Sequence, residues 1–300
     1  MTHDRPGVAE ATSVVIAAFN AELTIGGTVD SALEIGMSQV TVVDDGSTDQ
    51  TASVARSRGA TVLTQTNAGA AVARRVGLAV STGEFVVFLD ADDRLLPDIL
   101  KCVETLRADP QLGVAAGKLA VLGDNGTIRK QRIHPGYVPV DTATLLLHGY
   151  APWPPVAAVF RRAALRRAAQ IDPEPIEPGF AEDYELLLRC SRVGGIGVCD
   201  EVVAAYAVSG GKSGKQAELS IDSAARIASY YGNAWQMEFA KWDGGARRRL
   251  VATRSLQATY DLKGPIGLLR AALGDDGVRR ALAASAARRI RMRLARRAVR

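Results

Sequence analysis

The stretch Glu84-Phe-Val-Val-Phe-Leu-Asp-Ala-Asp-Asp93 decides how this chain is expected to fold. Residues 85–89 are consecutive apolar or aromatic side chains, a pattern typical of a buried central strand in a mostly parallel sheet. The run stops on three acids, Asp90, Asp92 and Asp93. Ligands of open α/β sheets bind at the carboxyl ends of the parallel strands, so we expect these side chains to face a binding crevice.

The three acids at the end of this strand have a second expected property. Clustered carboxylates repel one another unless a cation or a polar ligand neutralises them. Oxygen ligands suit Mg²⁺ or Mn²⁺, and such ions normally bridge the protein to a diphosphate. Asp92, with Asp90 beside it, is therefore the predicted metal site. The alternative, an acidic loop that also caps the next helix, stays open at this point.

Three further apolar runs, residues 13–18, 40–43 and 61–63, alternate with predicted helices upstream of this strand. Such alternation predicts βαβ units with right-handed crossovers. The first strand-to-helix turn contains no G-x-G-x-x-G, which disfavours a dinucleotide-binding Rossmann site. The second run ends on Asp44-Asp45-Gly46, where the glycine permits a tight turn.

Several side chains beside these turns have the chemistry to bind a nucleotide. Asp44 and Asp45 can accept hydrogen bonds from a pyrimidine N–H or a ribose hydroxyl. Phe19 offers a face to a base or ribose, or else belongs to the core. Glu22 either reaches a ribose or is a solvated acid in the first turn of a helix. Arg74 either presents its planar fork to a diphosphate or base, or is a solvated helix residue.

Four segments in this order and spacing resemble the successive motifs of glycosyltransferase family 2: Ala18-Phe-Asn-Ala-Glu22, Val42-Val-Asp-Asp-Gly-Ser-Thr-Asp49, Asn67-Ala-Gly-Ala-Ala-Val-Ala-Arg74 and Phe88-Leu-Asp-Ala-Asp-Asp93. The resemblance covers roughly the first two-thirds of the chain and fades after about residue 210. It implies a GT-A fold, an inverting mechanism and a nucleotide-diphosphate sugar donor, most simply a UDP-sugar. The nucleotide-binding residues that it implies are Phe19, Asn20, Glu22, Asp44, Asp45, Arg74, Asp90 and Ala91.

The second half of the chain contributes a pair of acids at the start of a predicted helix, Glu182 and Asp183. Acids at this position stabilise a helix through its dipole. The pair also matches the catalytic-base motif of the family, which implies that Asp183 is the base, with Glu182 next to it. The family's Q-x-x-R-W motif of processive synthases is missing, which favours single additions. Trp153, in a proline-rich loop, is either a platform for an acceptor sugar or a packing residue.

Composition limits the remaining possibilities. The three cysteines show no pairing pattern, which indicates a reducing compartment. No signal-peptide pattern is present, and no run approaches the ~20 apolar residues needed to span a bilayer. We expect a cytoplasmic protein. Residues 277–300 combine an apolar stripe with many arginines, which predicts either contact with an anionic membrane surface or a helix packed on the domain. Nucleic-acid binding is not expected, because no recognisable motif accompanies the charge.

The predicted architecture is an α/β GT-A domain, with a mostly parallel sheet flanked by helices, over residues 1–214. Its donor site falls within 13–100 and its acceptor and base region within 101–214, and a helical region follows over 215–300. The predicted activity is metal-dependent, inverting transfer of a sugar, of the hexosyltransferase class, to a hydroxyl of a glycan, a lipid-linked glycan or a small molecule. The alternatives are a sugar nucleotidyltransferase and a catalytically silent sugar-nucleotide-binding protein at the membrane.

Overall fold

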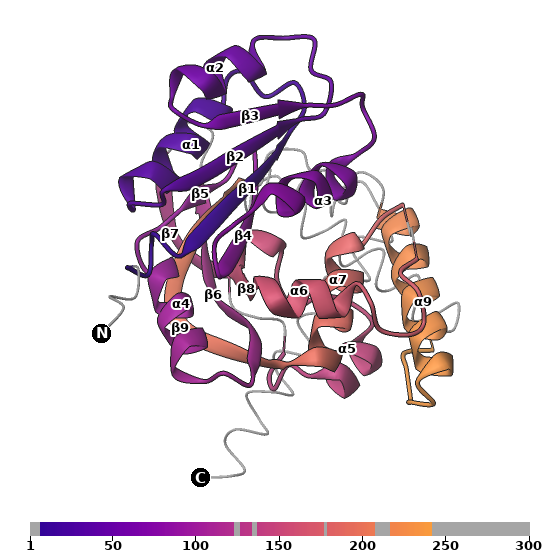
Figure 1. The fold of residues 1–300 in the computed structure, drawn as a ribbon. Coiled ribbons are helices and arrows are strands. Elements are labelled where there is room, and N and C mark those ends of the chain that lie inside the picture. The colour runs from indigo at the N-terminus through magenta and orange to yellow at the C-terminus, as the bar shows by residue number, and fades with distance from the viewer. Residues whose placement is uncertain (1–6, 123–126, 134–136, 177–178, 208–216, 242–300) are drawn as a thin grey trace, which may run out of the picture.

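The computed structural model describes residues 7–122, 127–133, 137–176, 179–207 and 217–241. They form a nine-stranded sheet with helices on both faces (Figure 1). The strands are β1 Thr12–Ala18, β2 Gln39–Asp44, β3 Thr61–Thr64, β4 Phe85–Asp90, β5 Arg94–Leu95, β6 Leu112–Leu122, β7 Ile128–Ile133, β8 Ala158–Arg161 and β9 Gly195–Ala207. The helices are α1 Ile25–Glu34, α2 Thr51–Ser57, α3 Ala70–Val80, α4 Ile99–Ala108, α5 Thr142–His148, η1 Pro155–Ala157, α6 Arg162–Ala168, α7 Glu182–Val193 and α9 Ala217–Ala234.

The first four strands of the sheet are parallel and lie in the order β3-β2-β1-β4. All apolar residues of the predicted central strand are buried, with Phe85, Val86, Val87 and Leu89 at 0% exposure. Burial on both faces explains why β1, β2 and β4 are unbroken apolar runs rather than alternating patterns, while β3 at the edge of the sheet is partly exposed. This half of the sheet confirms the predicted βαβ architecture.

The second half of the sheet is mixed rather than parallel. Strand β8 is antiparallel to both β4 and β6, while β6 is parallel to β9. Strands β6 and β7 form the antiparallel hairpin typical of the Asn-Gly pair between them. The prediction of a mostly parallel sheet therefore holds for the half formed by β3, β2, β1 and β4. In the other half, β8 inserts between two strands that run in the opposite direction to it.

Helices cover both faces of the sheet. Helices α1, α2 and α4 lie on one face, and α3, α6 and α7 lie on the other (Figure 1). Gly77 allows α3 to pack closely on the sheet, because a Cβ at this position would lie 2.3 Å from a methyl carbon of Val15. The close approach brings the first turns of α3 next to the carboxyl end of β4.

Helix α9 packs on α5 and α7. Its residue Tyr231 is fully buried and receives a hydrogen bond from Arg189 of α7, at 3.1 Å. The predicted basic helix at 277–300 lies outside the described residues. Within the described ranges, no helix is both long and apolar enough to cross a bilayer.

Candidate functional site

The turns after β1 and β2 are tied together by side chains. The backbone N–H of Asn20 donates to Ser47 Oγ at 2.9 Å, and the backbone N–H of Thr48 donates to Asn20 Oδ1 at the same distance. Asn20 has a φ of 49°, in the left-handed region that asparagine tolerates better than most residues. Glu22 accepts a bond from Gln50 N at 2.9 Å, so this predicted ribose ligand also braces the start of α2.

Asp44, the last residue of β2, and Asp45, which follows it, are both almost completely buried. Asp45 accepts hydrogen bonds from Gln65 Nε2, Ala68 N and Gly69 N, each at 2.8 Å, and so holds the turn before α3. Asp44 accepts one from Ser47 N at 3.1 Å. Both acids therefore have structural roles in addition to the base-binding role predicted for them. The site retains an aromatic surface at the end of β1, where Phe19 is 47% exposed.

Arg74 joins the end of β4 to the start of α7. Its Nη2 lies 2.6 Å from Asp90 Oδ1 and its Nη1 lies 3.7 Å from Glu182 Oε1. Burial lowers the pKa of this guanidinium, but the negative charges of Asp90, Glu182 and Asp183 outweigh burial and raise it. The interpretation of Arg74 as a solvated helix residue is therefore wrong, since its side chain is only 14% exposed.

The negative charges of Asp92 and Asp93, the acids that follow β4, are poorly compensated by their surroundings. Burial, and then repulsion from Asp90, raise the pKa of Asp92. The same causes, together with the charge of Asp92, raise the pKa of the fully buried Asp93 much further. Asp93 Oδ1 accepts a bond from Ala207 N at 2.8 Å, while Oδ2 has no hydrogen-bond partner among the described residues. Burial and mutual repulsion therefore disfavour the ionised forms of Asp92 and Asp93.

These acids fit a divalent ion that takes its remaining ligands from water and from the substrate. In the described part of the chain, no three His, Cys, Asp or Glu side chains are arranged to hold a metal by themselves. Mg²⁺ characteristically uses only one or two carboxylates and takes its other ligands from water and phosphate. Asp90 and Asp92 could supply these one or two carboxylates. Their side chains are half-buried hard oxygen donors, and the negative charge of Asp90 raises the pKa of Asp92.

Two residues that the sequence did not single out shape the turn at Ala91. Thr28 Oγ1 donates to Ala91 O at 2.9 Å, and Arg94 Nη1 donates to Thr28 Oγ1 at 2.9 Å. Helix α1 is thus fastened to the turn between Asp90 and Asp92. In the sequence, the only indication that Arg94 belongs to this site is its position directly after the acids.

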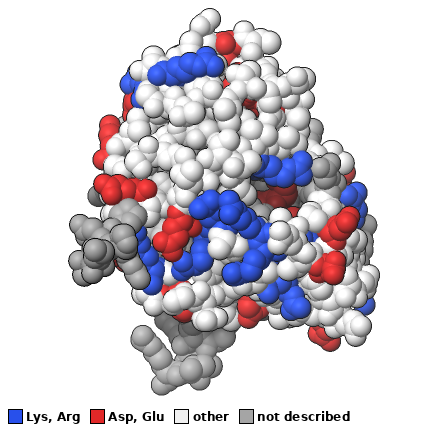
Figure 2. All heavy atoms as spheres, viewed as in Figure 1, with Lys and Arg blue, Asp and Glu red and all other residues white. Residues whose placement is uncertain are grey.

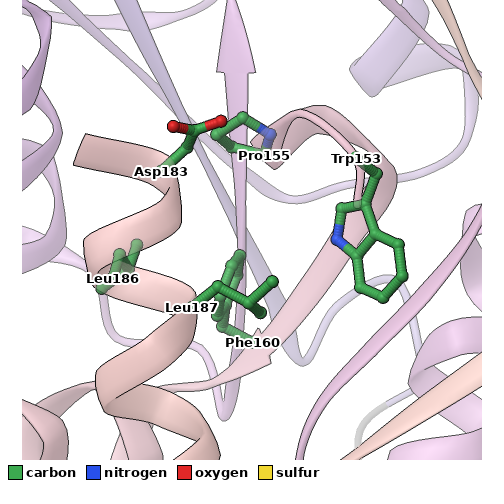
Figure 3. A pocket seen from close by; sticks show the side chains of 6 residues that line it. All are labelled: Trp153, Pro155, Phe160, Asp183, Leu186 and Leu187. Carbon is green, nitrogen blue, oxygen red and sulfur yellow. The ribbon is translucent and has the colours of Figure 1, made fainter. Parts of the chain in front are cut away.

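Helix α7 begins at Glu182 in an unusual backbone geometry. The preceding Ala181 has a φ of 60°, a left-handed conformation that costs an alanine roughly 1–2 kcal/mol. Such strained positions concentrate at functional sites. Asp183 follows in the first turn of the helix, and Figure 3 shows its carboxylate pointing toward Pro155 at the mouth of a small pocket.

Trp153 lines the same pocket, and its burial bears on the two roles considered for it, a platform for an acceptor sugar and a packing residue. Its lining residues are Trp153, Pro155, Phe160, Asp183, Leu186 and Leu187 (Figure 3). Trp153 is only 6% exposed and belongs to the main hydrophobic core. Because a stacking platform needs an open ring face, burial favours the packing role over the predicted contact with an acceptor sugar.

Tyr206, in β9, is a further residue that sequence patterns gave no reason to select. Burial raises the pKa of its hydroxyl, and so do the charges of Asp93, Asp90, Asp92 and Asp183. All four carboxylates are therefore close enough to act on one phenol. Acids from β4 and from α7 converge on a single site, and Figure 2 shows acidic atoms in a hollow between the positions of α3 and α7.

Comparison with known proteins places this site in context. Residues 13–169, more than half of the chain, match the model of glycosyl transferase family 2. The uncharacterized glycosyltransferase alr2836 of Nostoc sp. is 28% identical over 66% of this chain and 65% of its own length. The glucosyltransferase WfaP of Escherichia coli, whose name gives UDP-Glc and α-D-GlcNAc-diphosphoundecaprenol as its substrates, is 37% identical over 28% of this chain and 36% of its own. The uncharacterized glycosyltransferase YibD of Escherichia coli matches over 24% of its length, so the chain spans only part of these relatives.

Solved structures show the same fold. The mannosyltransferase PcManGT of Pyrobaculum calidifontis, in complex with GDP-Man and Mn²⁺, superposes with a TM-score of 0.56 at 20% identity, over 92% of this chain and 79% of that one. Residues 1–349 of TarS from S. aureus, in complex with UDP-GlcNAc, give a TM-score of 0.55 at 22% identity, over 83% and 72%. The predicted GT-A fold is thus confirmed.

Proposed function

The chain belongs to glycosyl transferase family 2, and we propose that it moves a sugar from a nucleotide-diphosphate sugar to an acceptor hydroxyl with inversion. The observation that carries this proposal is the bridge from Asp90 through Arg74 to Glu182. It brings the acids of β4, suited to a diphosphate and its cation, next to the acids that begin α7. Direct displacement needs this arrangement, with leaving-group stabilisation on one side and a base on the other.

Each side chain has a defined part in the proposed reaction. Asp183 takes the proton from the acceptor hydroxyl as the oxygen attacks the anomeric carbon. The nucleoside diphosphate leaves from the opposite face with the electron pair of the broken bond. Phe19 packs against the base or ribose, while Asp44 accepts a hydrogen bond from one of them.

The proposed cofactor is Mn²⁺ or Mg²⁺, held by Asp92 and Asp90. When bound, such an ion neutralises the charge that develops on the departing diphosphate. The chain's own contribution is to hold these two carboxylates close together and to keep Arg74 between them and Glu182. The complex of PcManGT with Mn²⁺ supports this assignment by analogy of fold alone.

A UDP-sugar is the proposed donor, with a hexose as the transferred group. TarS was crystallised with UDP-GlcNAc and PcManGT with GDP-Man, so the fold accommodates either base. The proposed acceptor is a glycan, a lipid-linked glycan or a small molecule, each receiving one sugar per encounter. We propose that the protein acts in the cytoplasm, in the synthesis of a cell-surface polysaccharide or glycoconjugate. The two roles considered for residues 277–300, contact with an anionic membrane and packing on the domain, both stay open, because these residues lie outside the described ranges.

The proposal is tested with a panel of UDP- and GDP-sugars, assayed for binding and slow hydrolysis with Mn²⁺, with Mg²⁺ and with a chelator. One donor should bind in the presence of metal and release its nucleoside diphosphate. An acceptor screen with that donor should then give a product whose anomeric configuration is opposite to that of the donor. Retained configuration would refute inversion. Nucleotide-sugar synthesis from a sugar phosphate would show a nucleotidyltransferase, and binding without turnover would show the silent alternative.

A further inference from the structure

We propose that an arginine band on α6, the residue before it and the end of α7 docks this protein on an anionic phospholipid surface. The band consists of Arg161, Arg162, Arg166, Arg167 and Arg192. Figure 2 shows a continuous group of basic side chains over the position of α6. The inference does not depend on sugar transfer, and it rests on described residues, none of which belongs to the segment 277–300.

The two parts of the band are joined by a direct contact. Arg167 Nη2 donates to Val193 O at the end of α7, at 2.9 Å, and Arg192 is the preceding residue of that helix. Arg192 also lies over the ring of Trp235, 5.0 Å from its centroid. Residues of α6 and α7 therefore present their charges on one continuous surface.

The guanidinium groups of the band are held mostly by neutral acceptors. Arg162 Nη1 donates to Ser81 O at 3.2 Å, and Arg167 donates to a backbone carbonyl as described above. Among the described residues, the carboxylate ion pair recorded in the band is that of Arg161 with Glu84, at 2.7 Å. These contacts orient Arg162 and Arg167 without cancelling their charge, so the band keeps a net positive charge.

Arg166, Arg167 and Arg192 are exposed, while the apolar residues of α6 are turned inward. Ala164 and Leu165 of this short helix are buried at 0% and 3% exposure, so α6 itself is anchored in the core. Exposed guanidinium forks on an anchored helix suit a surface that presents many phosphates. A bilayer containing anionic lipid is such a surface, and it attracts basic residues electrostatically.

The position of the band relative to the site supports the same partner. In Figure 2, the band lies on the same face of the molecule as the acidic hollow between α3 and α7, and next to it. Docking through the band would hold that hollow close to the membrane surface. Duplex nucleic acid is the competing polyanion, but the chain carries no recognisable nucleic-acid-binding motif.

The test compares the full-length chain with its double variant Arg166→Gln, Arg167→Gln in sedimentation with vesicles. One set of vesicles is pure phosphatidylcholine and the other is an equimolar mixture with phosphatidylglycerol. A matched control, Arg56→Gln, Arg58→Gln, removes the same charge from the last turn of α2 and the residue that follows it, at the far end of the sheet. The melting temperature of each variant verifies that it is folded.

We expect the wild-type chain to bind the anionic vesicles and not the neutral ones. Each lost arginine should weaken binding about fivefold, so the band variant should bind roughly 25-fold more weakly, while the control stays near wild type. Binding should weaken as salt rises, since charges are screened over ~10 Å at 0.1 M. Equal binding by wild type and band variant would overturn the proposal, as would an equal loss in the control. Band-dependent binding to duplex DNA without binding to vesicles would overturn it in favour of a nucleic-acid partner.

If the double variant fails to fold, Arg166→Gln alone replaces it. Arg166 is exposed and has no recorded hydrogen bond or ion pair in the described structure, so its loss should leave the fold intact. The single variant should bind anionic vesicles about fivefold more weakly than wild type. Unchanged binding by this folded variant would overturn the proposal.

Discussion

Arg74 Nη2 lies 2.6 Å from Asp90 Oδ1, and this one contact links α3 to the strand that carries the acidic motif. The other end of the same guanidinium faces Glu182 at 3.7 Å. A single side chain thus sets the distance between the proposed donor acids and the proposed base. Its Nε is buried without a hydrogen-bond partner among the described residues, so both charged contacts are needed to offset its desolvation.

Arg74→Gln should therefore destabilise the fold and impair transfer. We expect a loss of about 1–3 kcal/mol in the free energy of unfolding, below the range for a fully buried pair because Asp90 and Glu182 are 40% and 37% exposed. The loss should shrink when Mn²⁺ is present, because the cation replaces part of the missing charge. Urea unfolding with and without Mn²⁺ measures both effects. Arg75→Gln, at the exposed neighbouring position, is the control. An unfolding free energy equal to wild type in both conditions would refute the bridging role.

The sequence predicted the donor half of the fold well because its signals are local. Buried strands 13–18, 40–43 and 85–89 are short apolar runs, and the turn at Gly46 requires its φ of 76°. A Cβ at Gly46 would also lie 3.0 Å from Asn67 N, closer than side chains normally approach. The apolar runs and the positive φ depend on neighbours within a few residues, whereas the approach to Asn67 is a tertiary contact that adds to the requirement for glycine.

Partners that meet only through tertiary packing could not be predicted in the same way. The contact between Arg74 and Glu182 joins residues on separate helices, and nothing in the pattern of α3 indicates which way Arg74 points. Cys102 and Cys199 showed no pairing pattern, yet their sulfur atoms lie 3.4 Å apart as free thiols between α4 and β9. The burial of Trp153 likewise depends on how a proline-rich loop folds back on the core.

Asp92→Asn tests the assignment of the metal site. The substitution removes one negative charge where the proposed ion binds, so donor affinity measured with Mn²⁺ should fall, while affinity measured with a chelator should stay the same. Titration calorimetry with the preferred nucleotide-sugar measures both values. Equal donor affinity for wild type and variant with Mn²⁺ present would remove Asp92 from the site.

Phe19→Ala tests the proposed contact with the nucleotide. Phe19 is 47% exposed, so its loss should change the free energy of unfolding by less than about 0.5 kcal/mol, as is usual for a surface substitution. Donor binding should weaken by about tenfold if the ring packs against a base. Thermal melting and donor titration separate the two effects. A variant that binds donor as well as wild type does would assign Phe19 no part in recognition.

Asp93→Asn should change how stability depends on pH. A carboxyl whose pKa is raised by folding contributes stability that is fully present below its unfolded value, near 3.8, and lost as the pH rises through its folded value. In metal-free buffer at neutral pH the variant should therefore be more stable than wild type, and the difference should shrink as the pH falls. The amide oxygen of the introduced asparagine can still accept the bond from Ala207 N. The exposed Asp98→Asn serves as the control, and a pH-independent difference between Asp93→Asn and wild type would contradict the argument.

Asp183→Asn separates catalysis from helix stabilisation. Removing a charge from the first turn of α7 should cost only ~0.3–1 kcal/mol through the helix dipole. A general base, by contrast, contributes typically 10²–10⁴-fold to the rate. We therefore expect a folded variant that binds donor and metal as wild type does and transfers sugar at least about a hundredfold more slowly.

The matched control for this variant is Glu182→Gln, which removes the neighbouring acid from the same turn and also its contact with Arg74. Initial transfer rates, donor affinity and melting temperature are measured for both variants with the acceptor found by screening. If Asp183→Asn transfers sugar at nearly the wild-type rate while Glu182→Gln does not, the proton passes to Glu182 and Asp183 only stabilises the helix. If both variants fall to the same low rate with donor affinity unchanged, the pair acts together, with Arg74 holding Glu182 so that Asp183 faces the acceptor.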